Sequence, residues 1–458
     1  MNLPIAVAIS MLLTASSLSA QTPPAGRGGR GAPQAPAEPA APPIPALGQA
    51  ATGTLVHAYG QAEHWSMRAI VLLSLGSDWH PDAVACVLHA LRDKDERLVP
   101  YGLEVLRGMD DASLQQVATP ELVGELIDKQ LKRKNKLFTD RLCELLPRLL
   151  PAAKATDRRG FEEWWRAAKA TYAPPAWEAP PAATGEQKGG TVATKVVERA
   201  FDLRDAGLDV AIIIDSTGSM QIAIDTARDA IDDVVALLTG IAPKLRLGLA
   251  HYKDLGDMGD GAKLLVPMTR DQKEVREKLA KLIAGGGGDV PERVERGVAV
   301  ALSKEMGWNK DANRLLLVIG DAPPHPESEA PLYELVRKAR ELPFEVGKGP
   351  TTGPKKSEVR PFVTSTIATN PQAKASFEKI AEAGGGTSVM LEVGPPPAAP
   401  ARGGKGGTPA PAQPAKSSRS VQQVVEHILL LSFGAQHRPQ LQRFVRTFFE
   451  YRDAGLLN

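Results

Sequence analysis

Three patterns of hydrophobic and polar residues follow one another along the chain. Residues 51–172 repeat apolar positions at helical spacing, residues 196–393 alternate short apolar strands with amphipathic helices, and residues 420–458 carry two helical stripes. Segments rich in Pro, Ala and Gly separate these regions and predict linkers at 21–50, 173–195 and 394–419.

The first region predicts an all-α domain of six helices joined by short turns that contain Asp, Gly and Pro. The turn between the second and third helices reads Asp93-Lys94-Asp95, and helices paired at this spacing resemble HEAT-type repeats. An irregular helical bundle stays open as the alternative. The helices are expected at Ala62–Leu75, Pro81–Leu91, Glu96–Leu106, Pro120–Leu131, Thr139–Leu149 and Gly160–Thr171.

The second region predicts an α/β fold with a doubly wound, mostly parallel sheet and helices on both faces, because strands and helices alternate. The strands are expected at Leu208–Ile214, Leu245–His251, Leu264–Pro267, Arg314–Ile319, Val363–Ala368 and Ser388–Leu391. The helices are expected at Met220–Leu238, Asp271–Ile283, Glu292–Met306, Ala330–Arg340 and Ala373–Ala383.

The third region predicts a C-terminal helical tail. One apolar stripe runs from Val421 to Leu431 and another from Leu441 to Phe448. Such stripes must be covered, so we expect the tail to dock on a neighbouring domain, with binding of a separate partner as the alternative.

Composition and the first residues add a cellular setting. Leu3–Leu13 is largely apolar, and Leu18-Ser19-Ala20 precedes Gln21 as a cleavage site would, so residues 1–20 predict a signal peptide. We therefore expect an exported protein in the periplasm, at the cell surface or outside the cell, with no transmembrane segment in the mature chain. A net charge of +2 over 458 residues argues against nucleic acid as a partner. Cys86 and Cys143 could form a disulfide or stay as two buried thiols.

Candidate chemistry gathers where the first strand of the second region ends. The apolar run Val210–Ile214 leads into Asp215, and a turn through Thr217 and Ser219 leads into a helix. One carboxylate and two hydroxyls that converge on a point are hard oxygen ligands, which suit Mg²⁺ or a similar cation. The alternative is that one of the two hydroxyls only caps the helix.

Two further segments are expected at the same edge of the sheet. The strand Leu315–Ile319 ends in Gly320 and Asp321, and the glycine loop at 285–288 continues into Asp289 and Glu292. The carboxyl ends of parallel strands lie at one edge, where open α/β sheets bind their ligands. We therefore expect Asp321 and the glycine loop to meet the Asp215 turn.

These residues resemble the metal-ion-dependent adhesion site of von Willebrand factor type A domains over residues 205–393. The motif Asp-x-Ser-x-Ser stands here as Asp215-Ser216-Thr217-Gly218-Ser219, and the motif's distant Asp matches Asp321. The glycine loop has Asp289, or else Glu292, where the family pattern has Thr. The resemblance implies a site for Mg²⁺, or for Ca²⁺ or Mn²⁺, whose ligands are Asp215, Thr217, Ser219, Asp289 and Asp321.

The resemblance further implies a non-enzymatic binding protein that grips an acidic residue of a protein partner at the top face of the A domain. A third carboxylate at Asp289 would weaken the pull on the partner's carboxylate or fill the open metal position, so the site is expected to be structural or to prefer Ca²⁺. No Gly-Lys-Ser/Thr follows the glycine loop and Ser219 has no His–Asp pair in its sequence context, so no enzyme activity is expected.

Two other classes of function stay open. Helical repeats joined to an A domain also resemble the ring-shaped, RNA-binding Ro proteins, although this helical region is shorter than such a ring and the charge is near neutral. The third reading is a structural scaffold with a degenerate metal site.

Overall fold

The computed structural model describes residues 51–76, 79, 83–176, 192–254, 260–287, 290–341, 360–391 and 416–456. All of these residues belong to one compact unit. The expected signal peptide, the first linker, most of the other two linkers and Asp289 lie outside the described residues.

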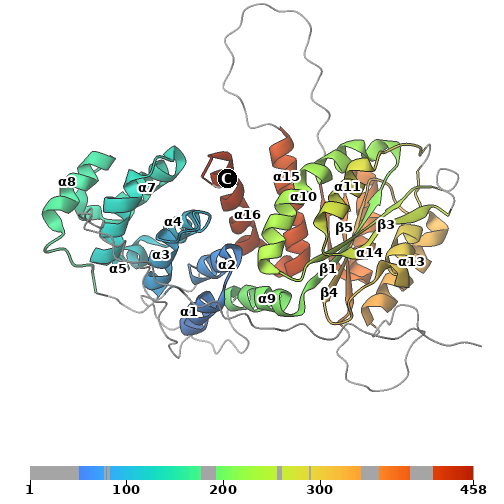
Figure 1. Cartoon of the computed structure of the whole chain (residues 1–458), viewed down its shortest axis with the longest axis horizontal. Coiled ribbons are helices and arrows are strands. Elements are labelled where there is room, and N and C mark those ends of the chain that lie inside the picture. The colour runs from blue at the N-terminus through green and yellow to red at the C-terminus, as the bar shows by residue number, and fades with distance from the viewer. Residues whose placement is uncertain are drawn as a thin grey trace, which may run out of the picture. The chain divides into compact units, whose positions relative to one another are not determined.

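A six-stranded sheet forms the centre of the second region, in the order β3-β2-β1-β4-β5-β6 (Figure 1). Only β3 is antiparallel to its neighbour, and the other pairs are parallel, which confirms the predicted mostly parallel sheet. The strands are β1 (Leu208–Asp215), β2 (Arg246–Tyr252), β3 (Ala262–Thr269), β4 (Asn313–Gly320), β5 (Phe362–Ala368) and β6 (Gly385–Met390).

Helices cover both faces of the sheet because alternate residues of the central strands point to opposite sides. Val210, Ile212 and Ile214 join one apolar core, whereas Ala211 and Ile213 join the other. The doubly wound fold is thus confirmed. The first core includes residues of α10 (Gln221–Ile241), α11 (Gln272–Lys281) and α15 (Lys416–Phe433), and the second includes residues of α12 (Val294–Ala301), α13 (Pro326–Glu341) and α14 (Pro371–Ala383).

The N-terminal region is helical, as predicted, but three helices were missed, one of which is α5 (Asp111–Gln116), between the third and fourth predicted helices. Helix α1 (Ala51–Gln61) precedes the first predicted helix, and α9 (Val192–Ala206) starts within the segment that was expected to be a linker. Helix α9 packs against α1 and α2, so tertiary contacts stabilise a helix that follows a linker-like composition. The remaining helices are α2 (Trp65–Leu75), α3 (Val84–Leu91), α4 (Val99–Arg107), α6 (Pro120–Gly124), α7 (Lys136–Leu149) and α8 (Arg158–Ala168).

The two tail helices cover different surfaces. Helix α15 packs along α10, and α16 (Arg438–Asp453) packs against α2 and α4 (Figure 1). Aromatic rings line the second contact: Trp65 stacks on Phe444 and Phe448 with centroids 6.2 and 5.9 Å apart. Arg452 of α16 also forms an ion pair of 2.5 Å with Asp233 of α10. The tail therefore contacts both the helical region and the sheet domain.

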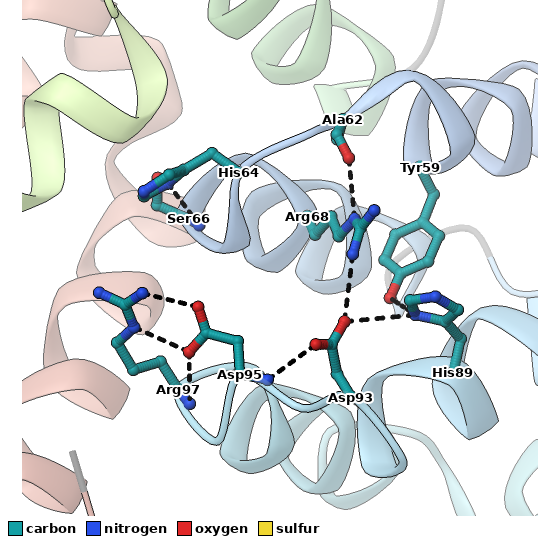
Figure 2. A network of polar contacts seen from close by, with 9 residues as sticks. All are labelled: Tyr59, Ala62, His64, Ser66, Arg68, His89, Asp93, Asp95 and Arg97. Carbon is teal, nitrogen blue, oxygen red and sulfur yellow. Dashed lines mark hydrogen bonds and ion pairs between the residues drawn. The ribbon is translucent and has the colours of Figure 1, made fainter. Parts of the chain in front are cut away.

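A polar network joins the first three helices to the turn before α4 (Figure 2). Asp93, in the turn between α3 and α4, accepts hydrogen bonds from Arg68 Nη1 at 3.1 Å and from the Asp95 backbone amide at 2.9 Å. His89 Nδ1 lies 3.6 Å from the same carboxylate and 3.1 Å from the Tyr59 hydroxyl. The Asp93-Lys94-Asp95 turn thus acts as a brace between helices, while its assignment to a HEAT-type repeat stays a prediction.

Neither cysteine forms a disulfide in the structure. Cys86 is a buried free thiol, and Cys143 is a half-buried one. None of the helices in the described ranges combines the length and apolarity that a membrane span requires.

Candidate metal centre

Asp215, Ser216 and Thr217, at the end of β1 and in the turn that follows, are buried. Asp215 pairs with Tyr252 of β2 and is fully buried. Its Oδ1 accepts hydrogen bonds from both the backbone amide and the hydroxyl of Thr217, each at 2.8 Å. The Thr217 hydroxyl lies 3.5 Å from that of the exposed Ser219. The turn therefore gathers one carboxyl group and two hydroxyls on one side of the chain.

Helix capping does not account for these hydroxyls. Thr217 precedes the single 3₁₀ turn Gly218–Met220 but makes no side-chain capping hydrogen bond there. The N-cap of α10 is Met220, again without a side-chain cap. The Thr217 hydroxyl binds Asp215 instead, so the alternative that these residues serve as caps finds no support in the geometry.

The environment of Asp215 disfavours its negative charge. Burial raises its pKa to about 7, the two hydrogen bonds from Thr217 oppose that rise, and the neighbouring Asp321 carboxylate adds to it. Lys253 acts in the opposite direction to Asp321. No described group forms a hydrogen bond with the buried Asp215 Oδ2 atom. A carboxylate that is buried with one oxygen unsatisfied is costly, and a bound cation would remove that cost.

The glycine loop lies directly against the Asp215 turn. Gly218 N donates to the Gly286 carbonyl at 3.0 Å, and Gly285 N donates to the Ser216 carbonyl at 3.1 Å. Gly287 has φ +74°, and a Cβ atom there would lie 2.9 Å from the Thr217 Cβ atom. Only glycine fits this position, so the loop can approach the two hydroxyls closely.

Asp321 approaches from the next strand. It follows β4, which pairs with β1 through Ile214 and Ile319, and its side chain is buried. The glycine before it is also required, because a Cβ atom on Gly320 would lie 2.3 Å from the Tyr252 hydroxyl oxygen. The structure therefore brings Asp215, Thr217, Ser219 and Asp321 to the carboxyl edge of the sheet.

Of the two acidic candidates that follow the glycine loop, only Glu292 is among the described residues. Asp289 lies outside the described residues, so its predicted role stays a prediction. Glu292 is buried beside the loop, and a Cβ atom on Gly287 would lie 3.4 Å from its Oε1. Within the described part of the chain, no three His, Cys, Asp or Glu side chains gather closely enough to hold a metal ion. A cation here would depend on the hydroxyls as well, and the hard oxygen donors present suit Mg²⁺ or Ca²⁺.

Two histidines near the turn have supporting contacts. Ser216 Oγ lies 2.8 Å from His251 Nδ1 and 3.2 Å from the Tyr252 carbonyl. The same carbonyl also accepts a hydrogen bond from the Ser216 backbone amide at 3.0 Å, and burial lowers the pKa of His251 to about 4, which favours the neutral ring. His325 lies at the rim, 3.1 Å from Asp254. Sequence reasoning missed the Ser216–His251 pair because 35 residues separate its members.

Comparison with known proteins identifies the domain that carries this edge. Residues 209–392 match the family model of the von Willebrand factor A domain. The chain is similar to the crystal structure of the SpRpn10 VWA domain, with a TM-score of 0.30 and 14% sequence identity over 41% of this chain and 89% of that chain. The chain thus contains a von Willebrand factor A domain at residues 209–392, preceded by a helical region.

A curated relative corrects one expectation. The chain is 30% identical over 123 residues to the alpha-protein kinase vwkA of Dictyostelium discoideum. The match covers 26% of this chain and 19% of that protein. The sequence analysis expected no enzyme activity, and a relative named as a kinase contradicts that expectation. The kinase activity is a property of the relative, of which this chain spans less than one fifth.

Proposed function

We propose that the A domain binds a protein partner through a divalent cation at the carboxyl edge of its sheet. The observation that carries this proposal is the fully buried Asp215 carboxyl, whose Oδ2 has no described hydrogen-bond partner. Thr217, Ser219 and Asp321 complete the proposed donor set. When bound, the cation supplies positive charge and a coordination position for a carboxylate of the partner.

The surface around the site supports a protein partner. Among the described residues, the strongly exposed large apolar side chains are Ile222, Ile283 and Val290. Gln221 Oε1 accepts a hydrogen bond from the Ala284 backbone amide at 3.1 Å, which holds the start of α10 beside the loop that carries Ile283. Exposed apolar side chains with polar groups at their rim are typical of protein interaction sites. The proposed partner therefore presents an acidic residue with apolar neighbours.

Metal titration tests the site itself. The proposed export predicts that protein sequencing of the mature chain finds Gln21 at its N-terminus. Titration of this mature chain with Mg²⁺, Ca²⁺ or Mn²⁺ should release or absorb heat. Asp215→Asn and Thr217→Val should weaken binding about tenfold or more, because each removes a direct donor. The matched control is Asp225→Asn, whose side chain is half exposed on α10 and pairs with Arg228. Equal heats for wild type and Asp215→Asn would contradict the metal site.

Partner binding needs its own measurement. Proteins of the native envelope are captured on immobilised wild-type chain and on Asp215→Asn, each with Mg²⁺ and with chelator. The proposal predicts a partner that is held by the wild type with Mg²⁺ and lost in both other conditions. Ile283→Ser, which leaves every proposed metal donor in place, should weaken capture without changing the metal titration. Capture that is indifferent to both chelator and Asp215→Asn would argue against metal-dependent recognition.

A further inference from the structure

A second polar site lies at the opposite edge of the sheet, where β1, β4 and β5 begin. A cavity of about 210 Å³ is lined there by three arginines from separate elements: Arg199 of α9, Arg314 of β4 and Arg360, which precedes β5. The tail closes another side through Leu431 and Ser432 of α15. No Asp or Glu is among the described residues that line this cavity.

Nearby carboxylates do not balance the three guanidinium groups. Asp202 is shared by two of them, at 2.6 Å from Arg199 Nη1 and 2.7 Å from Arg360 Nη2. Asp209, at the start of β1, accepts two hydrogen bonds from Arg246, one of them from Nε at 2.8 Å. Among the described residues, the three arginines thus share one carboxylate, Asp202, which leaves an excess of two positive charges around this part of the cavity.

Arg314 is the least compensated of the three. Its side chain is 3% exposed and lies over the Phe362 ring, with Cζ 3.9 Å from the centroid. It donates from Nη2 to the Arg360 carbonyl, but no described residue accepts a hydrogen bond from its Nε. Burial lowers its pKa to about 10. A buried guanidinium normally forms an ion pair, but among the described residues the nearby Asp209 raises the pKa of Arg314 without a direct ion pair, and Asp209 itself accepts hydrogen bonds from Arg246.

The other two arginines are already held in position. The Asn313 Oδ1 atom accepts from Arg199 Nη1 at 2.7 Å and from Arg360 Nη1 at 2.9 Å. Arg199 Nη2 also donates to the Ser432 carbonyl at 3.0 Å, at the end of α15. These bonds fix the guanidinium groups before any ligand arrives, which lowers the entropic cost of binding.

We propose that this cavity binds a phosphate-class dianion. Guanidinium groups recognise phosphate oxygens through paired N–H donors, and an excess of two positive charges matches a doubly charged anion better than a monocarboxylate. The cavity is smaller than the roughly 300 Å³ at which pockets for drug-sized ligands begin, so the ligand is a small free anion. The site is separate from the proposed metal centre, because it lies at the other end of the strands.

Thermal unfolding of the full chain tests this site at constant ionic strength. Inorganic phosphate should raise the Tm in a saturable manner, since a ligand that binds only the folded state stabilises it. Chloride should produce no such rise, and succinate, a small dicarboxylate, should produce a smaller one. A rise with chloride equal to that with phosphate would overturn the site, and an equal or larger rise with succinate would overturn the phosphate assignment.

Substitutions of the arginines test whether phosphate binds in this cavity. Arg314→Gln should weaken phosphate binding about tenfold or more, because it removes a buried donor. Arg360→Gln, whose native side chain is one-third exposed, gives the same test if Arg314→Gln fails to fold. The matched control is Arg337→Gln on α13, where the native side chain is half exposed and pairs with Glu334 and Glu341. Unchanged phosphate affinity in a folded Arg314→Gln or Arg360→Gln protein would refute the proposal.

Discussion

The polar network of the helical region and the polar edge of the sheet use similar residues in opposite ways. In the network, Asp93 is contacted by Arg68, by His89 and by a backbone amide (Figure 2). At the sheet edge, Asp215 is more deeply buried, and no described group forms a hydrogen bond with its Oδ2. A network whose members satisfy one another contributes stability, whereas an unsatisfied buried charge lowers it.

Both ends of the sheet carry buried charged groups that are incompletely paired, with opposite signs at the two ends. The carboxyl edge holds the buried acids Asp215 and Asp321, and the amino edge holds Arg314 without a carboxylate of its own. A fold keeps such groups only at some cost to its stability, which is common at functional sites. Incomplete pairing is therefore a better guide to function in this molecule than the number of polar residues.

The largest expected effect concerns Asp215 in chelator. Because its pKa is about 7 in the folded chain and 3.8 in the reference state, the folded state holds its proton more tightly. The metal-free wild type should lose up to about 4 kcal/mol of unfolding free energy as the pH rises from about 4 to about 8. Asp215→Asn should lack this loss and be more stable at pH 8, as measured by urea unfolding.

Bound Mg²⁺ should make the wild type, and not Asp215→Asn, the more stable of the two proteins. With saturating Mg²⁺ the wild type should gain stability and Asp215→Asn should not. A variant that is less stable than the wild type at pH 8 in chelator would show that Asp215 is satisfied without a ligand, and the contrast with Asp93 would disappear.

Asp93→Ala should produce an effect of intermediate size. It leaves Arg68 without its carboxylate partner and frees a backbone amide, so we expect a loss of about 1–3 kcal/mol of unfolding free energy. Asp140→Ala is the control, because its exposed pair with Lys136 should contribute little to the stability. Urea unfolding followed by circular dichroism measures both variants, and equal losses would indicate that the network is no more than surface pairing.

The smallest effect should come from His89. Burial foremost, and then Arg68, lower its pKa, while Asp93 raises it, so the folded chain favours the neutral ring. The unfolded chain takes up the proton first, so this contribution to stability is complete above about pH 6.5 and is lost as the pH falls. His89→Gln should flatten the wild-type decrease between pH 7 and 5, and an unchanged pH profile in the variant would exclude the histidine as its source.

The sheet was predictable because its central strands are continuous apolar runs. Strand β1 matches its predicted range apart from one residue at its end, and β4 extends one residue beyond its range at each end. Helix α9 was missed because Pro, Ala and Gly dominate the segment before it, and α2 begins at Trp65 rather than Ala62 because the His64 side chain caps it. These errors arise where a tertiary contact or a local hydrogen bond, rather than periodicity, decides the boundary.

The sequence by itself determined the doubly wound sheet and the association of Asp215 and Asp321 at one edge, because parallel strands that end in polar residues place them together. Tertiary structure alone decided that Asp215 keeps an unsatisfied oxygen, that Ser216 meets His251, and that Arg314 joins arginines from distant segments. The physical reason is that burial and pairing depend on which elements pack around a residue. Strand periodicity specifies the edge at which a side chain lies but not the partners that it finds there.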